Sequence, residues 1–149
     1  MLGSVARKLR IFGFDTLYLV HVEDSEVLKI GVDQGRVILT ADKEFFKRIV
    51  KAKASGVLVG GSDELEDLVH ILEKNGIRSI DRTESRCSMC NGILVEVSPN
   101  DVQDSLPEKI ASNHNEFFRC ASCSKIYWEG SHAKRIRLLA RILKSRLKE

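Results

Sequence analysis

At the centre of the first half of the chain lies the segment Val37-Ile38-Leu39-Thr40-Ala41-Asp42-Lys43-Glu44-Phe45-Phe46. Its first four residues are uncharged and rich in branched side chains, which is typical of a strand that is buried on both faces. From Lys43 onward, apolar residues follow helical spacing through Phe45 and Ile49, and Asp42 stands where a helix would be capped. The segment therefore predicts a strand, a turn and a helix.

The same alternation continues on both sides of this segment. We expect further strands at residues 16–22 and 57–59, because both runs are short, uncharged and rich in β-branched or aromatic side chains. Helices are predicted over residues 2–12, 24–35, 43–53 and 63–75 from their apolar spacing and from the glycines that follow several of them. A chain that alternates strands and helices in this way folds as an α/β protein with a parallel sheet.

The composition is that of a globular protein. Of the 149 residues, 43% are hydrophobic and 30% are charged. No apolar run approaches the roughly 20 residues that a transmembrane helix needs. No apolar signal-peptide core follows the basic residues Arg7, Lys8 and Arg10. We therefore expect a cytoplasmic protein without a membrane span.

All four cysteines lie in two Cys-x-x-Cys motifs, Cys87-Ser88-Met89-Cys90 and Cys120-Ala121-Ser122-Cys123. Two such pairs can supply four thiolates to one ion, and tetrahedral sulfur coordination favours zinc. Residues 91–119, between the motifs, leave room for short strands and an inserted loop. Disulfide bonds and a thioredoxin-like redox pair are the alternatives, although a redox pair would not need the second motif. We expect a structural Zn²⁺ bound by Cys87, Cys90, Cys120 and Cys123.

The C-terminal segment, from about Ser131, predicts a helix with an apolar and a basic face. The apolar positions are Ile136, Leu139, Ala140, Leu143 and Leu147, and the basic ones are Lys134, Arg137, Arg141, Lys144 and Lys148. The net charge of +3 is a weak argument for a nucleic-acid ligand, but its concentration in this helix is a better one. The basic face could be simply solvated, could contact an RNA or DNA backbone through Arg137, Arg141 and Lys144, or could lie on a membrane surface.

Three aspartates, Asp24, Asp42 and Asp63, follow the three predicted strands of the first half. Ligands of an open parallel sheet bind beyond the carboxyl ends of its strands, so we expect these carboxylates to lie close together there. Neighbouring carboxylates repel one another unless a proton or a cation lies between them, and their oxygens suit Mg²⁺ or Mn²⁺. Each aspartate could instead be a helix N-cap. Glu26 and Glu44 are the lesser candidates, should the strand registers differ.

Several segments resemble those of a known nuclease family. Residues 2–16, and residues 35–46 with their pattern Thr40-x-Asp42-x-x-Phe45, resemble the PIN-like RNase domain found at the C-terminus of Mut-type exonucleases. The segments around the cysteines, residues 86–92 and 117–132, resemble the zinc ribbon of the same family. The likeness extends to about Ile136, and the combination of motifs is specific.

This resemblance implies a PIN-like parallel sheet flanked by helices over residues 1–82. Over residues 83–149 it implies a four-cysteine zinc ribbon, which a C-terminal basic helix follows. Asp24, Asp42 and Asp63 would be the second, third and fourth acids of a pocket that holds Mg²⁺ or Mn²⁺ and hydrolyses RNA.

Family members also begin with a strand that ends in an aspartate just before the equivalent of Met1, and this sequence has neither. We expect a start site placed too late, in preference to a degraded and inactive member. Losing a central strand would remove many hydrogen bonds and much buried surface.

The function expected from these observations is a metal-dependent ribonuclease that acts on RNA phosphodiester bonds. The first alternative is a catalytically inactive RNA-binding zinc-ribbon module, which the missing first acid favours. A second alternative is a protein-interaction domain without affinity for RNA.

Overall fold

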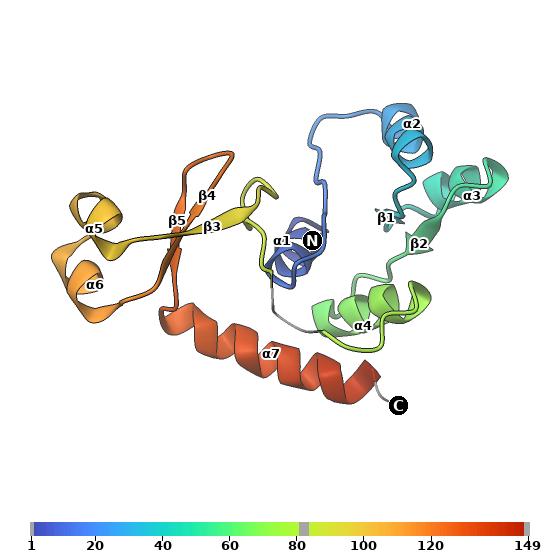
Figure 1. The fold of residues 1–149 in the computed structure, drawn as a ribbon. Coiled ribbons are helices and arrows are strands. Elements are labelled where there is room, and N and C mark those ends of the chain that lie inside the picture. Colours follow the sequence, from blue (N-terminus) through green and yellow to red (C-terminus); the bar gives the residue numbers. More distant parts are fainter. Residues whose placement is uncertain (1, 81–83, 148–149) are drawn as a thin grey trace. The chain divides into compact units, whose positions relative to one another are not determined.

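The computed structural model describes residues 2–80 and 84–147, which form two compact units (Figure 1). The first unit holds residues 2–5, 18–79 and 143–147, and the second holds residues 6–17, 80 and 84–142. Each unit therefore combines pieces from distant parts of the sequence. The predicted domain boundary at residue 82 lies outside the described residues.

The first unit is built on two short parallel strands, β1 (Ile38–Thr40) and β2 (Gly56–Leu58). Parallel strands need a crossover connection, and the helix α3 (Lys43–Lys51) supplies it. The core around this crossover consists of Ile38, Phe45 and Ile49, against which Val27, Leu28 and Ala54 pack. The predicted strand–turn–helix unit is thus confirmed.

The other predicted helices of the first half are present with small shifts at their ends. They are α1 (Leu2–Ile11), α2 (Asp24–Gln34) and α4 (Glu64–Lys74). Gly35 ends α2 with a φ of 63°, a left-handed conformation that glycine adopts without strain. At its other end the N-cap is Glu23, so Asp24 lies in the first turn, where its charge favours the helix dipole.

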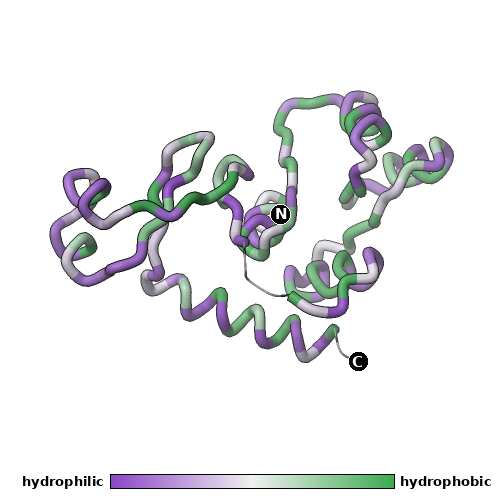
Figure 2. Tube along the Cα trace, viewed as in Figure 1, coloured by the Kyte–Doolittle hydropathy of each residue, from purple (hydrophilic) through white to green (hydrophobic). Residues whose placement is uncertain are grey.

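Residues 16–22 do not form a strand, so this prediction was wrong. A strand needs a neighbour to take its backbone hydrogen bonds, and within the described part of the chain β1 pairs with β2 alone. The backbone N–H of Thr16 donates instead to the side chain of Asn91, at 2.9 Å. The apolar residues that suggested a strand, Leu17 to Val20, are between 41% and 62% exposed in the loop that joins α1 to α2 (Figure 2).

The second unit contains a three-stranded antiparallel sheet in the order β3-β4-β5. Its strands are β3 (Leu94–Val97), β4 (Phe117–Cys120) and β5 (Ile126–Trp128). Between β3 and β4 the chain forms the short helices α5 (Pro99–Val102), η1 (Gln103–Ser105) and α6 (Glu108–Asn113). The short strands and the inserted loop expected between the cysteine motifs are therefore present.

The predicted C-terminal helix is α7 (Ser131–Leu147). Hydrophilic and hydrophobic residues alternate along its turns (Figure 2). Leu143 and Leu147 are buried, whereas Leu138 is 57% exposed. The predicted basic residue Lys148 lies outside the described residues.

Among residues 2–80 and 84–147, no helix combines the length and the apolar character that crossing a membrane requires.

Candidate metal centre

Two equivalent turns carry the four cysteines. In each turn, the residue after the second cysteine donates its backbone N–H to the carbonyl of the first: Asn91 to Cys87 at 2.9 Å, and Ser124 to Cys120 at 3.0 Å. These two donors also share a left-handed backbone, with φ values of 71° and 66°. The turns close because the N–H of the first cysteine bonds a carbonyl beyond the turn, on Gly92 in one case and on Lys125 in the other.

The sulfur atoms of Cys87, Cys90, Cys120 and Cys123 all lie within 4.8 Å of one another. Two of the Sγ–Sγ separations are 3.7 Å (Cys87 to Cys123) and 3.4 Å (Cys90 to Cys120). Tetrahedral zinc with Zn–S bonds of about 2.3 Å places its sulfurs about 3.8 Å apart. A disulfide would need about 2.05 Å, and all four thiols are unbonded. The cluster could therefore bind one zinc ion, and the disulfide alternative does not fit.

Charge is divided unequally among the sulfurs. Burial opposes ionisation of Cys87, but hydrogen bonds from the Tyr127 hydroxyl and from the N–H groups of Cys90 and Met89 lower its pKa to about 6. The Gly92 N–H lowers the pKa of Cys90. This effect is smaller than the combined opposite effects of burial and of the neighbouring thiols of Cys120, Cys123 and Cys87. Together these raise the pKa of Cys90 to about 12.

The pKa of Cys120 is lowered as well. Burial again acts against ionisation, and the backbone N–H groups of Cys123 and Ser122 overcome it. Four sulfurs this close together cannot all ionise without a cation, because each thiolate disfavours the next. A divalent metal removes that conflict, and binding it releases the remaining protons.

Gly92 has no room for a side chain. A Cβ at this position would lie 2.6 Å from Cys120 Sγ and 2.8 Å from Ser122 Oγ. Contacts below 3.0 Å force atoms to move, so any other residue would push the second cysteine turn away from the first. The close approach of the two cysteine turns therefore requires glycine at position 92, two residues after Cys90.

The three aspartates predicted at the strand ends have separate local roles. Asp42 caps α3 by accepting hydrogen bonds through Oδ1 from the N–H groups of Glu44 and Phe45, at 2.8 and 3.0 Å. Asp63 caps α4 through Oδ1, which accepts from Leu65 N–H at 2.8 Å.

Asp24 instead forms an ion pair with Arg48 on α3, at 3.5 Å, and both side chains are 51% exposed.

Groups of three or more His, Cys, Asp or Glu side chains whose ligand atoms lie within 4.8 Å of one another could hold a metal ion. Within the described residues, the four cysteines are the one group of this kind. Asp24, Asp42 and Asp63 do not form a second group of that kind. The N-cap explanation thus accounts for the positions of Asp42 and Asp63. Each cap uses Oδ1, so Oδ2 is not occupied by the cap.

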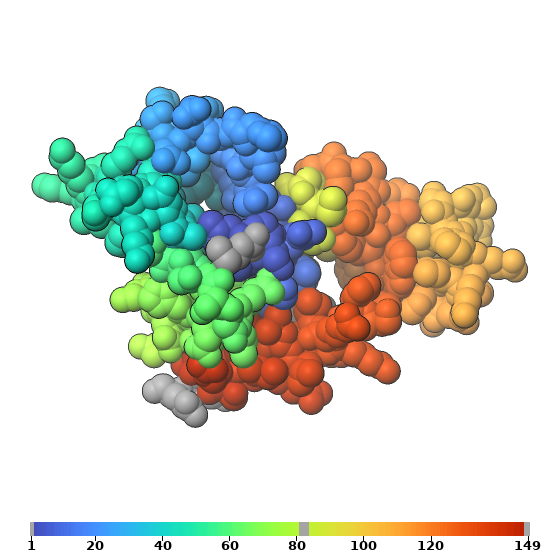
Figure 3. All heavy atoms as spheres, turned by 180° about the vertical axis from the view of Figure 1, so that it is seen from behind, coloured from blue at the N-terminus to red at the C-terminus, as the bar shows by residue number. Residues whose placement is uncertain are grey.

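Arg137, Arg141 and Lys144, the predicted nucleic-acid contacts, are exposed on α7. Arg137 pairs with Glu129 at 3.1 Å. Figure 3 draws one face of the molecule, on which part of the surface of α7 is visible.

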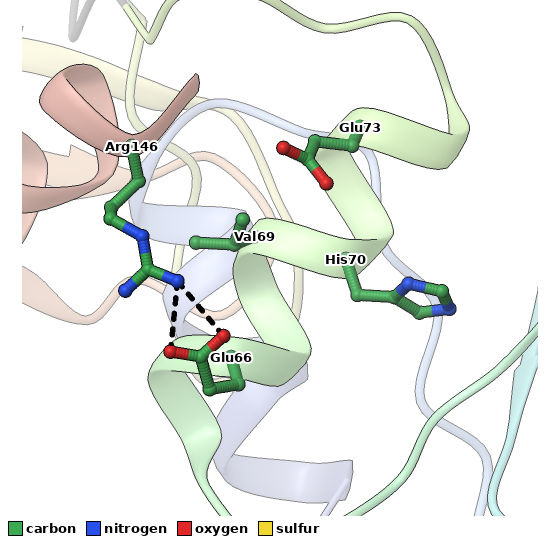
Figure 4. Close-up of a pocket in the computed structure, with 5 residues that line it drawn as sticks. All are labelled: Glu66, Val69, His70, Glu73 and Arg146. Atoms are coloured by element: carbon green, nitrogen blue, oxygen red, sulfur yellow. Dashed lines mark hydrogen bonds and ion pairs between the residues drawn. The ribbon is translucent and has the colours of Figure 1, made fainter. Parts of the chain in front are cut away.

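Next to the C-terminal turns of α7, a shallow hollow on α4 is lined by Glu66, Val69, His70, Glu73 and Arg146 (Figure 4). The guanidinium of Arg146 bridges both carboxylate oxygens of Glu66, at 2.9 and 3.0 Å. Both side chains are substantially exposed, so the pair stabilises the fold by about 1 kcal/mol or less. Glu66 lies three residues after Asp63, the N-cap of α4.

Two site residues were not found from the sequence. Tyr127 places its hydroxyl 3.0 Å from Cys87 Sγ and 3.3 Å from Ser88 Oγ. Asp67 is 95% buried, accepts from Gly61 N–H at 3.0 Å through Oδ1, and has no partner for Oδ2 among the described residues. Neither belongs to a motif: the Tyr127 contact joins residues 40 positions apart, and Asp67 bonds the turn six residues before it.

Residues 1–140 match the family model of the Mut7-C RNAse domain. The chain belongs to this family. No curated protein and no solved structure matches the chain significantly. The Mut7-C match includes all four cysteines and Asp24, Asp42 and Asp63, which confirms the family recognised from the motifs. The match ends inside α7, so Arg141 and Lys144 lie beyond the matched residues.

Proposed function

We propose that this protein is a metal-dependent ribonuclease that hydrolyses RNA phosphodiester bonds. The observation that carries the proposal is the match of residues 1–140 to an RNase family. In this proposal residues 1–82 form a PIN-like catalytic half, and residues 83–149 form a zinc ribbon with a basic helix. Four free thiols suit a reducing compartment, so the proposal places the enzyme in the cytoplasm.

Asp42 is the acid best placed for catalysis. It follows β1 by two residues, at the carboxyl end of a parallel strand, where ligands of α/β proteins bind. The cap bonds through Oδ1 fix the side chain against the first turn of α3. Its other oxygen, Oδ2, takes no part in the cap. Asp63, after β2, is fixed in the same way. Both side chains are held by their own helices, so they offer a carboxylate oxygen with little loss of rotamer freedom.

Mg²⁺ or Mn²⁺ bound to these carboxylates would activate water and neutralise charge that develops on the phosphate. The three aspartates do not form a group of potential metal ligands within the described residues, so binding the ion would require them to come together. Asp24 would have to exchange its ion pair with Arg48 for the metal. That pair is half exposed and therefore weak, so the exchange costs little.

The test compares RNA cleavage in Mn²⁺ by the wild type and by Asp42→Asn. Asparagine caps helices as well as aspartate does, so this change removes the charge and preserves α3. We expect cleavage by Asp42→Asn to fall to the level seen in EDTA. Asp33→Asn, which removes an exposed charge that pairs with Lys29 on α2, is the matched control and should cleave like the wild type.

A catalytically inactive RNA-binding module is the second candidate. The observation in its favour is that the three aspartates form no group of potential metal ligands within the described residues. This candidate predicts RNA binding that weakens with salt, does not respond to EDTA at the acidic residues, and leads to no cleavage. Equal cleavage by the wild type and Asp42→Asn would exclude the ribonuclease assignment made here.

A further inference from the structure

Arg10, on α1, is buried in the same compact unit as the cysteine turns. Its side chain is 6% exposed, and its guanidinium donates to the carbonyls of Ser88 at 3.0 Å and Met89 at 3.3 Å. These two residues lie between Cys87 and Cys90. A third bond, from Arg10 Nε to the Thr16 carbonyl at 2.8 Å, ties the guanidinium to the loop after α1. One side chain thus joins that loop to the first cysteine turn.

The charge of Arg10 has no carboxylate partner among the described residues. A buried cation that bonds only neutral carbonyls is costly unless negative charge lies nearby. Four thiolates around one Zn²⁺ carry a net charge of about −2, and the turn that Arg10 grips supplies two of those thiolates. With a metal bound, such a cluster would supply negative charge to the turn that the buried guanidinium bonds.

Asn91, directly after Cys90, makes the second connection. It is 8% exposed, and its side-chain amide donates to Asp15 Oδ1 at 2.7 Å while its Oδ1 accepts from Thr16 N–H at 2.9 Å. Its own N–H closes the first cysteine turn on Cys87. Both ends of this side chain are therefore used to hold residues 15 and 16 against the turn.

Backbone contacts at the end of α1 complete the attachment. Arg86 N–H donates to the Arg10 carbonyl at 2.9 Å, and Ser85 Oγ donates to the Ile11 carbonyl at 2.7 Å. Both bonds are accepted by carbonyls of the last turn of α1, where the Arg10 carbonyl also accepts from Gly13 N–H at 2.9 Å. The approach is close, because a Cβ on Gly13, whose φ is 92°, would lie 2.7 Å from the Glu84 carbonyl oxygen.

We propose that Arg10 and Asn91 are positioning residues of the metal–thiolate site, and that metal binding in turn fixes residues 10–16. The proposal rests on metal binding by the four cysteines and is independent of RNA cleavage. Simple packing of α1 on the sheet would produce similar contacts, but it would make neither zinc affinity dependent on Arg10 nor the order of residues 10–16 dependent on zinc.

Zinc affinity of the full chain, measured by competition with a chromogenic chelator, tests the first half. We expect Arg10→Gln and Asn91→Gly each to weaken zinc binding by about 10- to 100-fold, the usual effect of losing a group that supports a metal ligand. Glycine tolerates the positive φ of residue 91, so Asn91→Gly removes the side chain without backbone strain. Arg10→Lys keeps the charge but cannot reach three carbonyls at once, and should fall between Arg10→Gln and the wild type.

Arg78→Gln is the matched control, since Arg78 is exposed and belongs to the other unit. It should bind zinc like the wild type. Equal zinc affinity in Arg10→Gln and Arg78→Gln, or a wild type that binds no zinc, would overturn the proposal.

Hydrogen exchange of the wild type tests the second half without any substitution. The Thr16 amide, which is bonded to Asn91, should lose protection when zinc is removed. The Val59 amide, which bonds the Thr40 carbonyl at 2.8 Å in the other unit, should keep it. Unchanged protection of Thr16 in the metal-free protein would show that the metal does not fix this segment.

Discussion

At the scale of single residues, the hydroxyl of Tyr127 controls the charge of a candidate metal ligand. Burial raises the pKa of Cys87, but the Tyr127 hydroxyl, 3.0 Å from Cys87 Sγ, and the N–H groups of Cys90 and Met89 together lower it to about 6. Burial and the same contact raise the pKa of Tyr127 to about 12, so the phenol stays protonated and keeps donating. A ligand that is already ionised near neutral pH exchanges fewer protons when a metal binds.

We therefore predict that Tyr127→Phe raises the pKa of Cys87 in the reduced, metal-free protein. Because the folded-state pKa lies below the ordinary 9.0, this thiol stabilises the fold fully above pH 9 and loses that contribution as pH falls through about 6. A titration of thiolate absorbance should show the first ionisation moving to higher pH in Tyr127→Phe. Tyr18→Phe, at an exposed tyrosine of the other unit, is the control. Identical titrations of the wild type and Tyr127→Phe would contradict the prediction.

The sequence predicts contacts of this kind poorly, because they join residues far apart. Tyr127 follows Cys87 by 40 positions, and Arg10 precedes Ser88 by 78. No local pattern connects either pair. The cysteine cluster, in contrast, was predictable, since two short turns with fixed spacing each present two sulfurs to the same side.

At the scale of helices and strands, local patterns predicted most elements. Helices depend on bonds within four residues, so apolar spacing and caps such as Asp42 and Asp63 located α3 and α4 well. The failure at residues 16–22 has the opposite cause. A strand exists only when a partner takes its hydrogen bonds, and the sequence of the run itself says nothing about a partner.

The helix α7 offers a matched comparison of buried and exposed leucines. Leu143 is completely buried, and Leu138, little more than one turn earlier, is 57% exposed. We predict that Leu143→Ala lowers the free energy of unfolding by about 2–5 kcal/mol, through lost apolar burial and the cavity left behind. Leu138→Ala should change it by about 0.5 kcal/mol or less. Urea unfolding followed by circular dichroism measures both. Similar losses in the two variants would mean that α7 is not anchored through Leu143.

At the scale of the whole molecule, the positions of the positive charges along the chain are more informative than the net charge. The chain has a net charge of only +3, yet the segment 133–149 carries seven of its Lys and Arg residues against one Glu. Part of that charge is neutralised within the fold, by Glu129 on Arg137 and by Glu66 on Arg146. Arg141 and Lys144 lie beyond the matched residues and are exposed, so their predicted contact with an RNA backbone can be tested directly.

We predict that the double variant Arg141→Gln with Lys144→Gln binds single-stranded RNA less tightly and with a weaker dependence on salt. Each lost phosphate contact should reduce the slope of log affinity against log salt by about 0.7, because fewer counterions are released on binding. Fluorescence anisotropy at several salt concentrations gives the slope. The control is Arg78→Gln with Lys109→Gln, which removes the same net charge from exposed positions outside α7. If both double variants lose the same slope, net charge alone attracts the RNA and α7 is not its binding surface. If only the α7 variant changes, and Asp42→Asn binds RNA like the wild type, then α7 binds RNA independently of the charge at Asp42.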